Sequence, residues 1–154
     1  MLPKKSHSVN IWDVYNNKLI KFSKINDNYH ILKNISPVKG RYPNCGDEMS
    51  IYLELDDDTI KDISFKGELC MISTASANYM IDILKGKKIK QVRELIDEFN
   101  YFINHNEIKK EHLGIFENID IFEKVNKLHG RNNCALLPWN TVKFILDKNK
   151  GSLV

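Results

Sequence analysis

The length and charge of this chain exclude several classes of protein before any motif is considered. Its 154 residues can bury a hydrophobic core, so a bound metal would not be needed merely to keep the chain folded. Its 23 basic and 20 acidic residues give a net charge of only +3, which does not indicate a nucleic-acid-binding surface. No apolar run is long enough to cross a membrane.

The first 40 residues predict one helix and one edge strand. Residues 1–10 show no hydrophobic period, and we expect them to be the flexible end of a single domain that spans residues 1–154. Apolar residues recur every three or four positions between Ile11 and Phe22, which predicts an amphipathic helix. The more polar segment from Asn26 to Gly40 is expected to supply an edge strand.

The next segment has the alternating pattern of a β-hairpin. Apolar and polar residues alternate from Met49 to Leu55, three aspartates at 56–58 supply the turn, and Ile63 and Phe65 lie on the returning strand. With the edge strand before it, the hairpin predicts a small antiparallel sheet of about three strands.

Four helices are predicted after the hairpin. The first begins near Ser73 and ends before Gly86, and the second runs from about Lys88 to Ile103. The helical period resumes from Ile115 to Leu128, and a last helix is expected from about Pro138 to Lys148, with the proline in its first turn. The predicted fold class is therefore α+β, with helices that cover one face of the sheet.

The three cysteines lie at the ends of these predicted elements. Cys45 lies in a Pro/Gly turn two residues before Asp47, Cys70 follows the returning strand at the start of a helix, and Cys134 precedes the last helix. A helix N-terminus favours a thiolate. Because a hairpin brings both strand ends to one edge, three sulfurs and one oxygen could meet there as a tetrahedral set for zinc or a partial cradle for iron and sulfide.

The spacing of these residues leaves this metal site unproven. The chain has no Cys-x-x-Cys pair, and Asp47 could cap the turn as readily as bind a metal. An odd number of cysteines without an apolar leader segment favours a reducing cytoplasm, where thiols stay free or bind metal.

Four stretches of the sequence resemble a known family. They are PNCGD at 43–47, FKGELCMISTASA at 65–77, LKGK at 84–87 and CALLPW at 134–139. Together they resemble the iron–sulfur assembly proteins of the IscU/SufU (NifU N-terminal) type, over most of the chain from about Arg41. The long segment between Cys70 and Cys134 resembles the SufU branch, and so does Arg131.

The SufU resemblance implies a zinc-dependent sulfurtransferase that activates a partner and is not a stand-alone enzyme. It implies that Zn²⁺ is bound by four residues, namely Cys45, Asp47, Cys70 and Cys134. It also implies that a SufS-type cysteine desulfurase docks, that a partner group takes a place on zinc, and that the released Cys45 thiolate attacks the persulfide sulfur. The sulfur would then pass on for cluster assembly, with downstream iron–sulfur scaffold proteins as candidate acceptors.

Two other functions remain open from the sequence. The first is an IscU-like scaffold that assembles a labile [2Fe–2S] cluster on the same four residues. Relatives carry a histidine (IscU) or commonly a lysine (SufU) before the third cysteine, whereas this chain has Asn133, with His129 as the nearest candidate replacement. The second is a structural zinc module that only binds a partner. A thiol protease is poorly supported, because no recognisable motif places a histidine near a cysteine.

Overall fold

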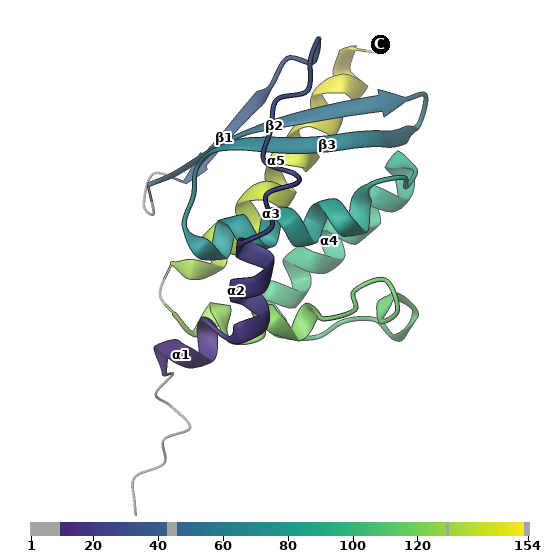
Figure 1. Ribbon diagram of the computed structural model, residues 1–154. Helices are drawn as coiled ribbons and strands as arrows, with labels where there is room; N and C mark the ends of the chain where they lie inside the picture. The colour runs from purple at the N-terminus through teal and green to yellow at the C-terminus, as the bar shows by residue number, and fades with distance from the viewer. Residues whose placement is uncertain (1–9, 43–45, 129, 153–154) are drawn as a thin grey trace, which may run out of the picture.

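A three-stranded antiparallel sheet forms one layer of the protein, as the sequence predicted (Figure 1). The computed structural model describes residues 10–42, 46–128 and 130–152. The strand order is β1-β2-β3, and the bounds of the strands are Val38–Tyr42, Asp47–Asp56 and Thr59–Glu68. The predicted hairpin is confirmed as β2 and β3. The edge strand is β1, which begins at Val38, near the end of the predicted segment, and extends past Gly40 to Tyr42.

The helices lie on one side of the sheet (Figure 1), where α3 contacts β3 and α5 contacts β1 and β2. The α-helices are α1 (Ile11–Val14), α2 (Asn17–Ser23), α3 (Met71–Leu84), α4 (Ile89–His105) and α5 (Arg131–Ser152). Short 3₁₀ helices lie between α4 and α5, namely η2 (Lys110–His112), η3 (Ile119–Phe122) and η4 (Val125–Lys127). None of the helices formed by the described residues combines the length and the apolar character that a membrane span requires.

Aromatic side chains hold the helical layer together. The rings of Phe99 on α4 and Trp139 on α5 are stacked with their centroids 4.0 Å apart. Tyr79 of α3 packs edge-on against Phe122, and its hydroxyl donates a hydrogen bond to the carbonyl oxygen of Glu117. The ring of Tyr79 also lies 6.4 Å from those of Phe99 and Trp139. These contacts fix α3, α4 and α5 against one another, and thereby the positions of the cysteines on α5 and before α3.

The prediction of one continuous N-terminal helix with a fully buried apolar face is wrong. The chain forms α1 and α2 instead, because the side chain of Asn16 accepts a hydrogen bond from the amide of Leu19 and so starts a new helix. Ile11 and Trp12 are 53% and 73% exposed, so they do not pack in the core as the period suggested.

Two further helix predictions also differ from the structure. Residues 115–128 form η3 and η4 and not one helix, since Asn118 adopts a left-handed conformation with a φ of 67°. The last helix begins at Arg131, so that Pro138 lies in its interior and Cys134 in its first turn. The predicted flexible residues 1–9, and also Cys45 and His129, lie outside the described residues.

Candidate metal centre

Three of the four predicted ligands come together from three separate elements. Asp47 is the first residue of β2, Cys70 is the N-cap of α3, and Cys134 lies in the first turn of α5. One carboxylate oxygen and the two sulfurs all lie within 4.8 Å of one another. Because Zn–S bonds of about 2.3 Å place two tetrahedral sulfurs roughly 3.8 Å apart, the spacing and the donor chemistry fit a zinc ion. The fourth predicted ligand, Cys45, is not among the described residues.

The cluster is enclosed on most sides. Cys134 is fully buried and Asp47 is 5% exposed, whereas Cys70 is half-buried. Burial of a carboxylate or a thiolate is costly unless the charged group is hydrogen-bonded or binds a cation.

Asp47 is held by two donors from the start of α3. Its Oδ1 accepts a hydrogen bond from the amide of Cys70 at 2.9 Å, and its Oδ2 accepts one from the hydroxyl of Ser73 at 2.5 Å. Burial raises the pKa of this carboxyl, but the hydrogen bonds from Ser73 and Cys70 outweigh burial and lower the pKa below its usual value. Each carboxylate oxygen keeps a further lone pair, so Asp47 can both cap the backbone and bind a metal.

Cys70 has the environment of a thiolate. A hydrogen bond with Cys134 is the largest cause of a lowered pKa, which is about 6 in spite of the opposing effect of burial. Its Sγ also accepts a hydrogen bond from the amide of Ser73 at 3.4 Å, as expected for an N-cap side chain. The prediction that Cys70 lies at a helix N-terminus is therefore confirmed.

Arg131 and Ser73 also lie beside Cys134. The guanidinium of Arg131 lies 3.9 Å from its Sγ and supplies positive charge beside the cluster. The carbonyl oxygen of Cys134 accepts a hydrogen bond from the hydroxyl of Ser73 at 3.0 Å. Ser73 thus contacts both Asp47 and Cys134. This role was not predicted from the sequence, in which the serine indicated only the start of a helix. A small polar residue three positions after a candidate N-cap was the available signal.

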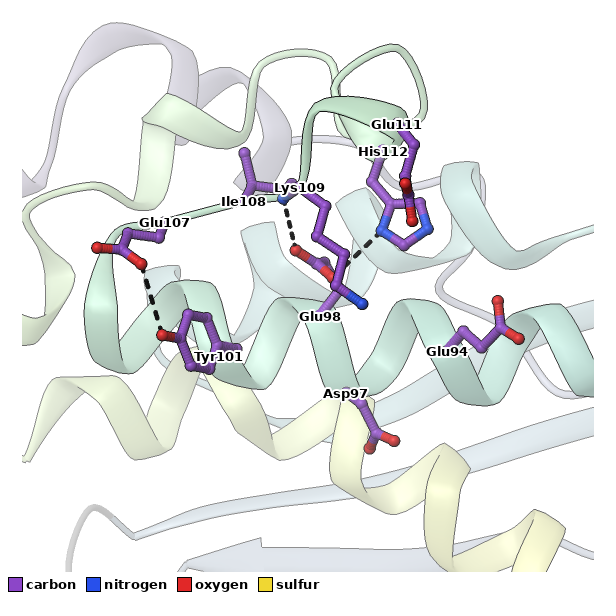
Figure 2. Close-up of a pocket in the computed structure, with 9 residues that line it drawn as sticks. All are labelled: Glu94, Asp97, Glu98, Tyr101, Glu107, Ile108, Lys109, Glu111 and His112. Carbon is purple, nitrogen blue, oxygen red and sulfur yellow. Dashed lines mark hydrogen bonds and ion pairs between the residues drawn. The ribbon is translucent and has the colours of Figure 1, made fainter.

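A separate acidic cavity of about 790 Å³ lies between α4 and residues 107–112 (Figure 2). Glu98 is 6% exposed there, yet it accepts a hydrogen bond from the amide of Lys109 at 2.8 Å and lies 3.2 Å from Nδ1 of His112. These partners satisfy the buried carboxylate within the protein, so the cavity needs no ligand to explain it.

Comparison with known proteins gives one family and two kinds of relative. Residues 14–135 match the NifU-like N terminal domain. The iron–sulfur cluster assembly scaffold protein IscU of Streptococcus pyogenes serotype M1 is 34% identical over 123 residues, which cover 79% of this chain and 75% of that protein. The zinc-dependent sulfurtransferase SufU of Bacillus subtilis strain 168 is 29% identical over 147 residues, which cover 95% of this chain and 98% of that protein.

One solved structure extends the likeness to the fold. It is the crystal structure of a SufU from the thermophile Fervidobacterium islandicum AW-1, described as an iron–sulfur cluster assembly scaffold protein for the SUF system. It superposes with a TM-score of 0.80 at 28% identity, over 88% of this chain and 98% of that chain. The similar proteins thus include both a scaffold and a sulfurtransferase.

Proposed function

The chain belongs to the NifU-like N-terminal domain family of iron–sulfur cluster assembly proteins, and we propose that it acts there as a zinc-dependent sulfurtransferase of the SufU type. The observation that carries this proposal is the cluster of Asp47, Cys70 and Cys134, whose donor atoms lie within 4.8 Å of one another. The SufU relative also spans 95% of the chain. We further propose that residues 1–154 form one domain that works in the cytoplasm, where thiols stay reduced.

The metal site in this proposal has four protein ligands. Asp47, Cys70 and Cys134 would be joined by Cys45, which precedes Asp47 by two residues. Three sulfurs and one oxygen suit zinc, and the oxygen is the harder and more readily exchanged donor. Bound zinc would keep the cysteines as thiolates at neutral pH. Arg131 would offset part of the negative charge of the site.

Cys45 is the proposed sulfur acceptor. A SufS-type cysteine desulfurase would dock and present a persulfide, and the Cys45 thiolate would attack its terminal sulfur. The sulfur–sulfur bond of the partner breaks, the partner cysteine leaves as a thiolate, and the terminal sulfur keeps its proton in the new Cys45 persulfide. No general base is required. The persulfide would then serve a downstream scaffold protein.

Replacement of Cys45 tests this acceptor role. Cys45→Ala should abolish stimulation of the desulfurase, and wild-type protein should gain the mass of one sulfur atom on the Cys45 peptide after incubation with the desulfurase and cysteine. Metal analysis of the purified wild-type protein should find zinc. Full stimulation by Cys45→Ala would overturn the acceptor role, and unchanged sulfur flux with Cys45→Ser or Asp47→Ala would favour a structural zinc module.

A scaffold function is the second candidate, and the IscU relative at 34% identity favours it. A carboxylate ligand would make an assembled [2Fe–2S] cluster easier to release. Anaerobic reconstitution with iron and sulfide separates the two functions. A scaffold should yield a stable coloured cluster, whereas a zinc sulfurtransferase should keep its zinc and stay colourless.

A further inference from the structure

One buried hydroxyl touches all three described ligand residues. The Ser73 Oγ lies 2.5 Å from Oδ2 of Asp47, 3.0 Å from the carbonyl oxygen of Cys134 and 3.5 Å from Sγ of Cys70. The Ser73 side chain is completely buried, so water does not compete for these contacts. This residue therefore joins the ends of β2, α3 and α5 at the point where the cluster forms.

The hydroxyl has one hydrogen for three possible acceptors, which are the Asp47 carboxylate, the Cys134 carbonyl and the Cys70 sulfur. The Asp47 oxygen is the nearest of them, and a hydroxyl bonded to a carboxylate has this short, charge-assisted geometry. The Cys134 carbonyl is also within reach, and Pro138 has no amide hydrogen that could compete for it. The Ser73 hydroxyl thus keeps an acceptor whether or not Asp47 stays in place.

We propose that Ser73 is a positioning residue of the metal centre, which holds the Asp47 carboxylate among the sulfurs in the orientation that binds the ion. This inference rests on the proposed metal site. Groups that orient a metal ligand through a hydrogen bond typically contribute about 10- to 100-fold to metal affinity. Loss of the hydroxyl should therefore weaken Zn²⁺ binding, and it should do so through Asp47.

Ser76 supplies a matched control on the same helix. It is also completely buried, and its hydroxyl also joins α3 to α5, since it donates to the carbonyl oxygen of Ala135 and accepts from Nε1 of Trp139. These two hydrogen bonds involve neither Asp47 nor a thiol. Ser76→Ala therefore removes a comparable interhelical bridge while the contacts of the cluster remain.

A double-mutant cycle on Zn²⁺ affinity tests the proposal. Competition with a chromophoric chelator gives the Kd of wild type, Ser73→Ala, Asp47→Ala and the double variant. We expect Ser73→Ala to weaken Zn²⁺ binding by about 10- to 100-fold, with little further loss when Asp47 is already alanine, and Ser76→Ala to bind as wild type does. In the Co²⁺-substituted protein, the visible absorption bands should shift in Ser73→Ala and not in Ser76→Ala.

Each other outcome overturns the proposal in a recognisable way. Ser73→Ala could reduce Zn²⁺ affinity by the same factor in the Asp47→Ala background as in wild type, or Ser76→Ala could reduce it as much as Ser73→Ala does. Either result would mean that Ser73 acts only on the fold. If wild type and Ser73→Ala bind Zn²⁺ with the same affinity, the role of Ser73 is overturned and the metal site stands. If wild type does not bind Zn²⁺, both the role of Ser73 and the metal site are overturned. If Ser73→Ala does not fold, the isosteric pair Ser73→Thr and Ser73→Val gives the same comparison, with affinity expected to be kept by threonine and lost with valine.

Discussion

Pro138 follows Cys134 by four residues within α5, and the Cys134 carbonyl oxygen accordingly bonds to Ser73 of α3. An α-helix normally supplies the amide of residue i+4 to each carbonyl, and proline cannot do so. The hydroxyl of Ser73, on α3, lies within hydrogen-bond distance of this carbonyl. This relationship ties the backbone of one predicted ligand to the helix that carries another.

The first prediction concerns the reactivity of Cys70. Its pKa is lowered to about 6, chiefly by the hydrogen bond with Cys134. In metal-free protein, alkylation of Cys70 by iodoacetamide should therefore rise to half its maximum near that pH, because only the thiolate reacts. Cys134→Ala removes the main cause and should move the midpoint to higher pH. An unchanged midpoint in Cys134→Ala would contradict this explanation.

The same pKa shift makes the stability of the metal-free protein depend on pH. The folded-state pKa of Cys70 lies below the ordinary value of 9.0, so its contribution is fully present above about pH 9 and is lost as the pH falls to about 6. Cys70→Ser lacks this titration but keeps a good N-cap side chain. The free energy of unfolding, measured in urea, should therefore fall for wild type relative to Cys70→Ser as the pH is lowered from about 9 to about 6. A constant difference would show that Cys70 does not titrate as expected.

Zinc should stabilise the fold of the wild-type protein. A ligand that binds only the folded state at a thousand times its Kd contributes about 4 kcal/mol to the free energy of unfolding. Zn²⁺ should accordingly raise the Tm in differential scanning calorimetry, and EDTA should reverse the rise. In Cys134→Ser, Zn²⁺ should raise the Tm by only a small part of this amount, because Cys134 supplies one of the two described sulfurs in the cluster. A full rise in that variant would place the stabilising zinc elsewhere.

Gly67 should tolerate substitution much less well than Gly86. A Cβ at Gly67 would overlap the carbonyl oxygen of Glu48 in the neighbouring strand, and its φ of +146° is unfavourable for other residues. Gly67→Ala should therefore lower the free energy of unfolding by about 2 kcal/mol or more. Gly86 also has a positive φ, of +85°, but nothing lies within 4 Å of a Cβ there. Gly86→Ala should cost about 1 kcal/mol, from backbone strain alone. Urea unfolding of both variants checks this order, and an equal cost would contradict it.

Glu98 should anchor the segment that follows α4. Its carboxylate accepts a hydrogen bond from the amide of Lys109 and lies beside the half-buried side chain of His112. Glu98→Ala leaves these groups without an acceptor and should destabilise the fold by about 1 to 3 kcal/mol. Glu94 is exposed on the same helix, so Glu94→Ala should change the free energy of unfolding by less than about 0.5 kcal/mol. Hydrogen exchange at the Lys109 amide should become faster in Glu98→Ala but not in Glu94→Ala, which would show that the loss of stability comes from this hydrogen bond. Equal stability of the two variants would contradict the prediction.

The elements that followed from local patterns were predictable from the sequence. The hairpin alternates with period two, and α4 has a continuous apolar stripe, so each is encoded within its own segment. The resemblance to the IscU/SufU type depends on short motifs around the cysteines and was predictable for the same reason, and it is confirmed by the match over residues 14–135. The assignment of Cys45 as ligand and sulfur acceptor stays a prediction, because that residue lies outside the described part of the chain.

Contacts between distant segments decided what the sequence by itself could not. Local rules place a proline in the first turn of a helix, yet α5 begins seven residues before Pro138. The Cys134 carbonyl, to which Pro138 cannot donate, accepts a hydrogen bond from Ser73, which lies 61 residues earlier in the chain. The approach of Asp47, Cys70 and Cys134 likewise depends on how β2, α3 and α5 pack, and no spacing in the sequence encodes that distance. Sequence determined which residues could bind a metal, and tertiary packing decided that three of them, with one serine between them, lie within reach of a single ion.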